Sequence, residues 1–242
     1  MPIAIFWAVF TNDGEVKYDR DHGINTYNIT RDDIAASYPL LNNGGMSYSG
    51  WQIAGTNRTA TAWVSDFLGD EFDGGPLTDG MARLQAEVDK LPDHKKFRYT
   101  NFTSRPFQVW TDLQEARAIV NNYADVISSD VYWYTPNTCE VVTSPIYAQY
   151  YRTHVPADTC RTSHTYGVQV DMMRDLDASD GKLKPIWNFI ENVGNLPYIQ
   201  PIQLKGAAWS SLIHEARGIN WFNNTFDGNC TSGNNIRNAQ TN

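Results

Sequence analysis

Two glutamates, Glu71 and Glu191, stand where a pair of carboxyl groups can do acid–base and nucleophilic chemistry. Glu71 ends the segment FLGDE and Glu191 ends the segment IWNFIE, each after an apolar run typical of a buried strand. Glycoside hydrolysis needs one protonated carboxyl group to donate to the leaving oxygen and one ionised carboxylate to attack or stabilise the anomeric carbon. The charge of Asp70 favours a proton on its neighbour, so we predict Glu71 as acid/base and Glu191 as nucleophile. The alternative is two ordinary exposed acids at strand ends.

The elements that must position these residues are apolar and β-branched runs, separated mostly by helical or turn-rich segments. We expect eight strands, at Ile3–Phe10, Ile24–Ile29, Met46–Ala54, Ala62–Leu68, Phe97–Phe102, Val126–Tyr134, Pro185–Glu191 and Ile219–Phe222. We expect helices at 31–41, 78–91, 111–124, 165–178 and 204–217, the last closed by Gly218.

This alternation favours one α/β domain, a closed (β/α)8 TIM barrel, over an open doubly wound sheet. The first strand is not followed by a Gly-rich phosphate turn, and no nucleotide-binding motif is present. Residues 223–242 are rich in Asn, Gly and Thr and show no apolar period. We therefore predict a barrel over residues 1–222. Either its eighth helix is missing, or 223–242 leads into a further part of a longer chain.

Aromatic and amide side chains near the predicted strand ends suit a sugar site. Flat rings pack on the apolar faces of sugar rings, and amide groups hydrogen-bond hydroxyls. The candidate substrate-binding residues are Asp70, Trp7, Asn28, Asn101, Tyr132, Tyr134 and Trp221. The alternatives are core packing for the aromatic residues, since alternate strand side chains face inward, and a loop hydrogen bond for Asn101.

Charge and composition exclude several classes of protein. The 19 Lys and Arg residues against 27 Asp and Glu residues give a net charge of −8, which disfavours a nucleic-acid partner. No apolar window is long enough for a membrane span, and the sequence shows no targeting segment. We predict no metal and no cofactor.

Three cysteines are too few for a disulfide scaffold and lack the spacing of a zinc site. Cys139 and Cys160 bracket a Tyr-rich stretch that contains proline, so they are either a loop disulfide or two free thiols. Cys230 is either free or paired outside this chain.

Several motifs resemble known families. GDE at 69–71, W-x-F-x-E at 187–191 and AAWSSLIHEARGINWF at 207–222 resemble the (β/α)8 retaining glycoside hydrolases of clan A, with acid/base and nucleophile on strands four and seven. VYWYTPNTC, the later Cys160, YGVQVDMMRDLD and ARGINWFNNTF look like the hydrolase-like barrel in minor tail proteins of phages that infect actinobacteria.

The resemblance implies acid/base and nucleophile roles for Glu71 and Glu191 and a disulfide between Cys139 and Cys160. It implies a retaining glycoside hydrolase that cuts a cell-surface or cell-wall polysaccharide, located outside the cell in a virion tail with other tail proteins as partners. Most clan members carry Asn before the acid/base glutamate, where it binds the sugar 2-hydroxyl, and this chain has Asp70. The alternatives are a carbohydrate-binding receptor module without catalysis and a structural tail-tip protein.

Overall fold

The computed structural model describes residues 1–6, 12–28, 37–51, 56–93, 95–108, 112–134, 159–192 and 199–222. The strands are β1 Ile3–Phe6, β2 Thr26–Asn28, β3 Ser47–Gly50, β4 Trp63–Asp70, β5 Phe97–Phe102, β6 Val126–Ser129, β7 Trp187–Glu191 and β8 Gly218–Phe222. The described helices are α1 Asp13–Asp21, α2 Ser37–Gly44, α3 Leu77–Asp89, α4 Arg105–Gln108, α5 Leu113–Asn122, α8 Ser163–Asp177 and α9 Pro201–Ile213, with a 3-10 turn η2 at Ala178–Asp180.

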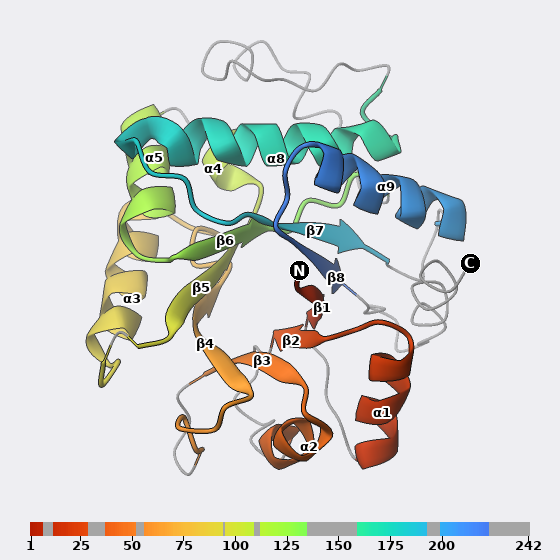
Figure 1. Cartoon of the computed structure of the whole chain (residues 1–242). Coiled ribbons are helices and arrows are strands. Elements are labelled where there is room, and N and C mark those ends of the chain that lie inside the picture. Colours follow the sequence, from red (N-terminus) through yellow and green to blue (C-terminus); the bar gives the residue numbers. More distant parts are fainter. Residues whose placement is uncertain are drawn as a thin grey trace.

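All eight strands are parallel and form one sheet in the order β6-β5-β4-β3-β2-β1-β8-β7. A parallel bridge between Ile127 and Ile186 joins the two ends of this order, so the sheet curls into a nearly closed barrel. The described helices lie outside it, with α8 and α9 side by side over β6, β7 and β8 (Figure 1). The predicted (β/α)8 TIM barrel is confirmed.

Strand alternation divides the core into two parts. Asn188 on β7 points outward, because its amide donates to the carbonyl of Tyr166 on α8 (2.8 Å) and to Ser211 on α9 (2.7 Å). Its neighbours Trp187 and Phe189 therefore face the inside. They belong to a barrel-interior cluster that comprises Phe6, Phe67, Tyr99, Val126, Trp187, Phe189 and Phe222. The larger apolar core fills the space between the sheet and the helices.

The structure corrects three sequence expectations. Strand β6 ends at Ser129 and not at Tyr134, because the backbone N–H of Asp130 makes the last bond to the Phe102 carbonyl and Tyr132 to Tyr134 then leave the sheet. Helix α1 was missed, because DGEVKYDRD has few apolar residues, although Asn12 caps it by accepting from the N–H groups of Gly14 and Glu15. Gly218 opens β8 instead of closing a helix, because α9 already ends at Ile213. A glycine fits at 218 because a Cβ there would meet the Trp187 ring at 2.6 Å.

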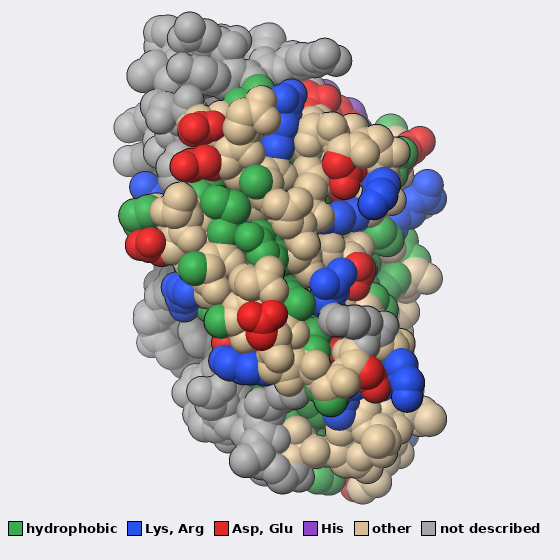
Figure 2. Space-filling view, turned by 90° about the vertical axis from the view of Figure 1, so that its left-hand side faces the viewer, with side chains coloured by type: hydrophobic (Ala, Val, Ile, Leu, Met, Phe, Trp, Pro, Cys, Tyr) green, Lys and Arg blue, Asp and Glu red, His purple; other side chains and the backbone are tan. Residues whose placement is uncertain are grey.

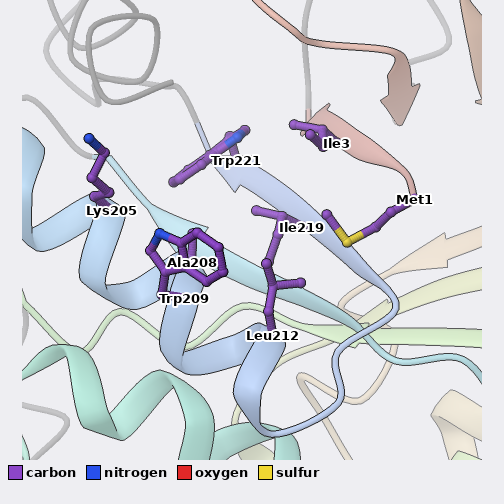
Figure 3. Close-up of a pocket in the computed structure, with 8 residues that line it drawn as sticks. All are labelled: Met1, Ile3, Lys205, Ala208, Trp209, Leu212, Ile219 and Trp221. Atoms are coloured by element: carbon purple, nitrogen blue, oxygen red, sulfur yellow. The ribbon is translucent and has the colours of Figure 1, made fainter. Parts of the chain in front are cut away.

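The outer face of β8 borders a groove beside α9. Ile219 and Trp221 point into it from the strand, and Trp209 and Leu212 line it from the helix (Figure 3). Trp209 is 63% exposed. In a complete barrel a helix after β8 covers this place, but residues 223–242 lie outside the described residues. The domain boundary at residue 222 therefore stays a prediction.

The face that carries α3 and α5 shows acidic and basic side chains interspersed, without a basic stripe (Figure 2). Such mixing is typical of a solvated helix face. Among the described helices, none has both the length and the apolar character that a membrane span requires.

Helix α3 is seated on the loop after β4 through a glycine. A Cβ at Gly80 would stand 2.5 Å from the Phe72 carbonyl oxygen, which cannot move aside like a flexible side chain. We expect Gly80→Ala to lower the unfolding free energy by about 1–3 kcal/mol, although alanine normally favours a helix. Chemical denaturation is the measurement. Thr78→Ala, at an exposed position of the same helix, is the control, and an equal or higher stability of Gly80→Ala would contradict this packing.

Candidate active site

The carboxyl ends of β4 and β6 bring four acidic residues together, namely Asp70, Glu71, Asp73 and Asp130. We call these residues the acidic cluster. The negative charges of Glu71, Asp70 and Asp73 all act on Asp130 and raise its pKa. Barrel enzymes carry their catalytic groups at this end of the strands. The sequence pattern predicts Glu71 and Asp70 but not Asp73 and Asp130, because a single Asp in a loop or after a strand is a weak signal.

Glu71 is exposed, and its backbone lies in the left-handed region, with φ of 52°. A side chain other than glycine is disfavoured in this conformation, which persists only where the surroundings impose it. Here the Glu71 N–H donates to the Asn101 carbonyl (3.0 Å) and the Glu71 carbonyl accepts from Gly74 N–H (2.9 Å). Strain of this kind is concentrated at functional positions, so the structure singles out Glu71 within the acidic cluster.

Burial shifts the proton affinity of the other acids. It raises the pKa of Asp70 to about 6, against the opposing effect of a hydrogen bond from Asn101 and with added repulsion from Glu71 and Asp73. Burial also raises the pKa of Asp73 to about 6, although Thr103 donates to its carboxylate from both N–H and hydroxyl. The pKa of Asp130 is raised well above its usual range by burial first and then by the negative charge of Glu71. The barrel end therefore holds protons on carboxyl groups at mildly acidic pH.

A chain of hydrogen bonds crosses the barrel interior and ends at Asp70. The Asn28 amide donates to Asn220, the Asn220 amide to the Tyr99 hydroxyl, and the Asn101 amide to Asp70. Tyr99 and Ser128 connect Asn220 with Asn101: the Tyr99 hydroxyl donates to Ser128, and the Ser128 hydroxyl donates to Asn101. The direction is fixed because the Ser128 hydroxyl has one proton and gives it to Asn101, so it accepts from Tyr99. The donor–acceptor distances are 2.5 to 3.0 Å.

Every donor in this interior chain points towards Asp70. Hydrogen bonds aligned in one direction polarise one another, and here they favour negative charge at Asp70. Burial raises the pKa of Tyr99 well above its usual range, so its hydroxyl remains a donor. At the far end, the Oδ1 atom of Asn28 is buried and has no hydrogen-bond partner among the described residues. The predicted residues Asn28, Asn101 and Asp70 thus belong to one connected network.

Glu191 ends β7, as predicted, and is fully buried. Its Oε1 atom accepts from the backbone N–H of Tyr134 and from the Tyr166 hydroxyl (2.9 Å). The pKa of Tyr166 is raised well above its usual range by burial and then by the charge of Glu191, so this hydroxyl stays protonated and remains a donor. The two donors fix the orientation of the carboxylate.

The predicted aromatic residues have different surroundings. Tyr132 stands over the barrel-interior cluster, with its ring 5.4 Å from that of Phe222 and its hydroxyl 3.3 Å from Asp130. Tyr134 packs on Tyr166 and donates to the Gln203 carbonyl. Trp221 lies on the outer face of β8, in the groove beside α9 (Figure 3). Trp7 lies outside the described residues.

Cys160 is buried and disulfide-bonded. Cys139 and Cys230 lie outside the described residues, so the predicted pairing of Cys139 with Cys160 stays a prediction. Within the described ranges, no group of three or more His, Cys, Asp or Glu side chains is arranged to hold a metal ion.

Comparisons with known proteins support the fold. A protein of Bacteroides thetaiotaomicron described as a "putative alpha-L-fucosidase" superimposes with a TM-score of 0.53 at 10% identity, over 99% of this chain and 95% of its own. An HpcH/HpaI aldolase of Desulfitobacterium hafniense gives a TM-score of 0.46 at 10% identity, over 91% and 85%. Only the first is close enough to support a shared barrel. No family model and no curated protein sequence matches the chain.

The raised pKa of Asp70 predicts how stability depends on pH. Since its pKa is higher in the folded state than in the unfolded chain, the folded state binds more protons between about pH 4 and 6, and stability falls as pH rises through that range. We expect Asp70→Asn, which can still accept from Asn101, to stabilise the protein by about 1–3 kcal/mol at pH 7.5 and hardly at all at pH 4. Denaturation at both pH values measures this.

The control for this pH experiment is Asp79→Asn, which changes an exposed aspartate of α3. The difference in unfolding free energy between pH 4 and pH 7.5 should be the same in this variant as in wild type. A gain from Asp70→Asn of equal size at pH 4 and pH 7.5 would rule out the buried charge as its cause.

The interior chain predicts a second stability effect. Tyr99→Phe keeps the ring but leaves buried groups of Ser128 and Asn220 without their partner, so we expect a loss of about 1–3 kcal/mol in unfolding free energy. Tyr18→Phe removes a hydroxyl from an exposed ring and should change little. A Tyr99→Phe protein as stable as wild type would contradict the network.

Proposed function

We propose that this chain is a glycoside hydrolase that cleaves a cell-surface or cell-wall polysaccharide. The observation that carries the proposal is Glu71, an exposed carboxyl group held in a strained backbone conformation at the end of β4, among buried acids that retain protons. In the proposed reaction this carboxyl group exchanges a proton with the leaving oxygen.

In the proposed mechanism Glu191 is the nucleophile and Glu71 the acid/base. Glu71 protonates the glycosidic oxygen as the bond to the anomeric carbon breaks, and Glu191 forms a covalent glycosyl ester. Water then attacks the anomeric carbon, gives its proton to Glu71 and releases Glu191. Two inversions at one carbon retain its configuration.

Two kinds of likeness support this proposal. The described fold is shared with the Bacteroides protein described as a "putative alpha-L-fucosidase", and the GDE and W-x-F-x-E motifs resemble clan A hydrolases. The resemblance to phage minor tail proteins extends the proposal to an extracellular site of action on a virion tail, where other tail proteins would be partners.

A second candidate function is carbohydrate binding without catalysis. One observation favours it: Glu191 is fully buried, and its Oε1 already accepts two hydrogen bonds. A nucleophile must reach the anomeric carbon, so catalysis requires that substrate gain access to this carboxylate.

The test is release of reducing sugar from purified actinobacterial cell-wall polysaccharide. We expect Glu71→Gln and Glu191→Gln each to lose at least about 100-fold of the wild-type rate while still binding the polysaccharide. Glu87→Gln, on the outer helix α3, should keep the wild-type rate. Proton NMR of the first product should show the anomer of the substrate.

Binding without sugar release by the wild type would favour the second candidate function. Release that persists in both glutamine variants would contradict the two-carboxylate mechanism.

A further inference from the structure

A cavity of about 640 Å³ opens at the amino-terminal mouth of the barrel, at the end of the strands opposite to the acidic cluster. Each of the eight strands contributes a lining residue, either from its first two positions or from the residue just before it. The cavity is therefore a bowl enclosed by the whole ring of strands. Its volume lies in the range of sites that bind small molecules, roughly 300 to 1,000 Å³.

The mouth is open because several strands begin with small side chains. The interior of a barrel of this size is normally filled by bulky side chains. Here Pro2, Thr26 and Ser47 line the mouth from β1, β2 and β3 and add little volume. Gly218, which opens β8, adds no side chain, and the ring of Trp187 lies against it.

The inner end of the cavity is an aromatic wall. The rings of Phe97 and Trp187 meet edge to face with centroids 5.8 Å apart, and both residues line the cavity together with Val126. All three belong to the barrel-interior cluster or pack against it. The next inward side chains of β5 and β7, Tyr99 and Phe189, are fully buried. The cavity is thus a separate site that does not continue to the acidic cluster.

Two charged residues line the cavity, and one of them is already neutralised. Arg98 donates to the Asp125 carboxylate from its backbone N–H (2.8 Å), its Nε (3.0 Å) and its Nη2 (2.9 Å). Burial acts to raise the pKa of Asp125, but the hydrogen bonds from Arg98 outweigh it and lower the pKa. Arg217 is exposed, and within the described part of the chain its guanidinium has no ion pair or hydrogen bond. One positive charge is therefore available at the mouth.

We propose that the amino-terminal mouth is a second binding site, which takes a small carboxylate with an apolar body. The apolar body lies against Phe97 and Trp187, and the carboxylate pairs with Arg217, whose planar guanidinium suits two parallel hydrogen bonds. The Ser47 hydroxyl is a further donor at the same mouth.

The chemistry of the lining disfavours other classes of ligand. A sugar needs hydrogen-bond partners for many hydroxyl groups, and a mostly apolar wall does not supply them. A cation would meet Arg217, while the carboxylate of Asp125 is occupied by Arg98. This second site is independent of the proposed hydrolysis, which takes place at the other end of the barrel.

The test uses two probes of the same shape and different charge, biphenyl-4-carboxylate and biphenyl-4-carboxamide. Isothermal titration calorimetry of the full chain at about pH 7.5, where the carboxylate is ionised, measures the affinity of each. We expect one carboxylate per chain with a Kd of about 1 mM or lower. The amide should bind about 10-fold more weakly, because it lacks the charge that pairs with Arg217.

Two variants separate the contributions of charge and space. Arg217→Gln, at an exposed position, should weaken the carboxylate about 10-fold and leave the amide unchanged. Ser47→Phe fills the mouth and should weaken both probes, and circular dichroism shows whether this variant is folded. Arg161→Gln changes an exposed arginine that does not line the cavity and should bind both probes like wild type.

The groove beside α9 needs its own control, because it is also apolar. Trp209→Ala removes an exposed ring from that groove and should leave both affinities unchanged. Loss of binding in this variant would place the probe in the groove and overturn the proposal. Wild type that binds neither probe, or binds both equally well, would overturn it too, as would an unchanged carboxylate affinity in Arg217→Gln.

Discussion

The cost of burying negative charge at one end of a closed barrel is the constraint on which this site depends. A parallel barrel fixes its interior side chains in layers, and water is excluded from the layers below the strand ends. Negative charge at Asp70 is therefore stabilised from within the protein, by the interior chain of amide and hydroxyl donors that begins at Asn28 and passes through Tyr99. Two halves of the sheet that are distant in sequence cooperate in this support.

The same constraint gives the two candidate catalytic carboxyl groups different surroundings. Glu71 lies at the surface beside acids that hold protons, whereas Glu191 lies in the interior with two donors on one oxygen. Two carboxyl groups with different roles need such unlike environments. The arrangement is consistent with a division of labour between β4 and β7, which are separated by β5 and β6 around the barrel.

The strand pattern predicted the barrel because buried parallel strands are continuous apolar runs, and these are visible without knowledge of pairing. Glu71 and Glu191 could be named because they follow such runs directly. Asp130 could not, because its importance comes from the acids of the β4 end that act on it, and the predicted strand ran on to Tyr134 past it. Tyr99 and Asn220 were missed for a similar reason, since their roles come from partners 29 and 121 residues away. Trp221 was predicted as a site residue from its position on a strand, but strand position alone did not reveal that its side chain faces outward, towards α9.

The left-handed backbone at Glu71 has a consequence for laboratory evolution. Glycine occupies that conformation without the penalty that glutamate carries, on the order of 1 kcal/mol. A library selected only for heat resistance would therefore tend to enrich glycine at position 71 and lose the carboxyl group that we assign to proton transfer. Selection for stability favours glycine at position 71, and selection for turnover favours glutamate. A screen of variants of this protein therefore needs both selections.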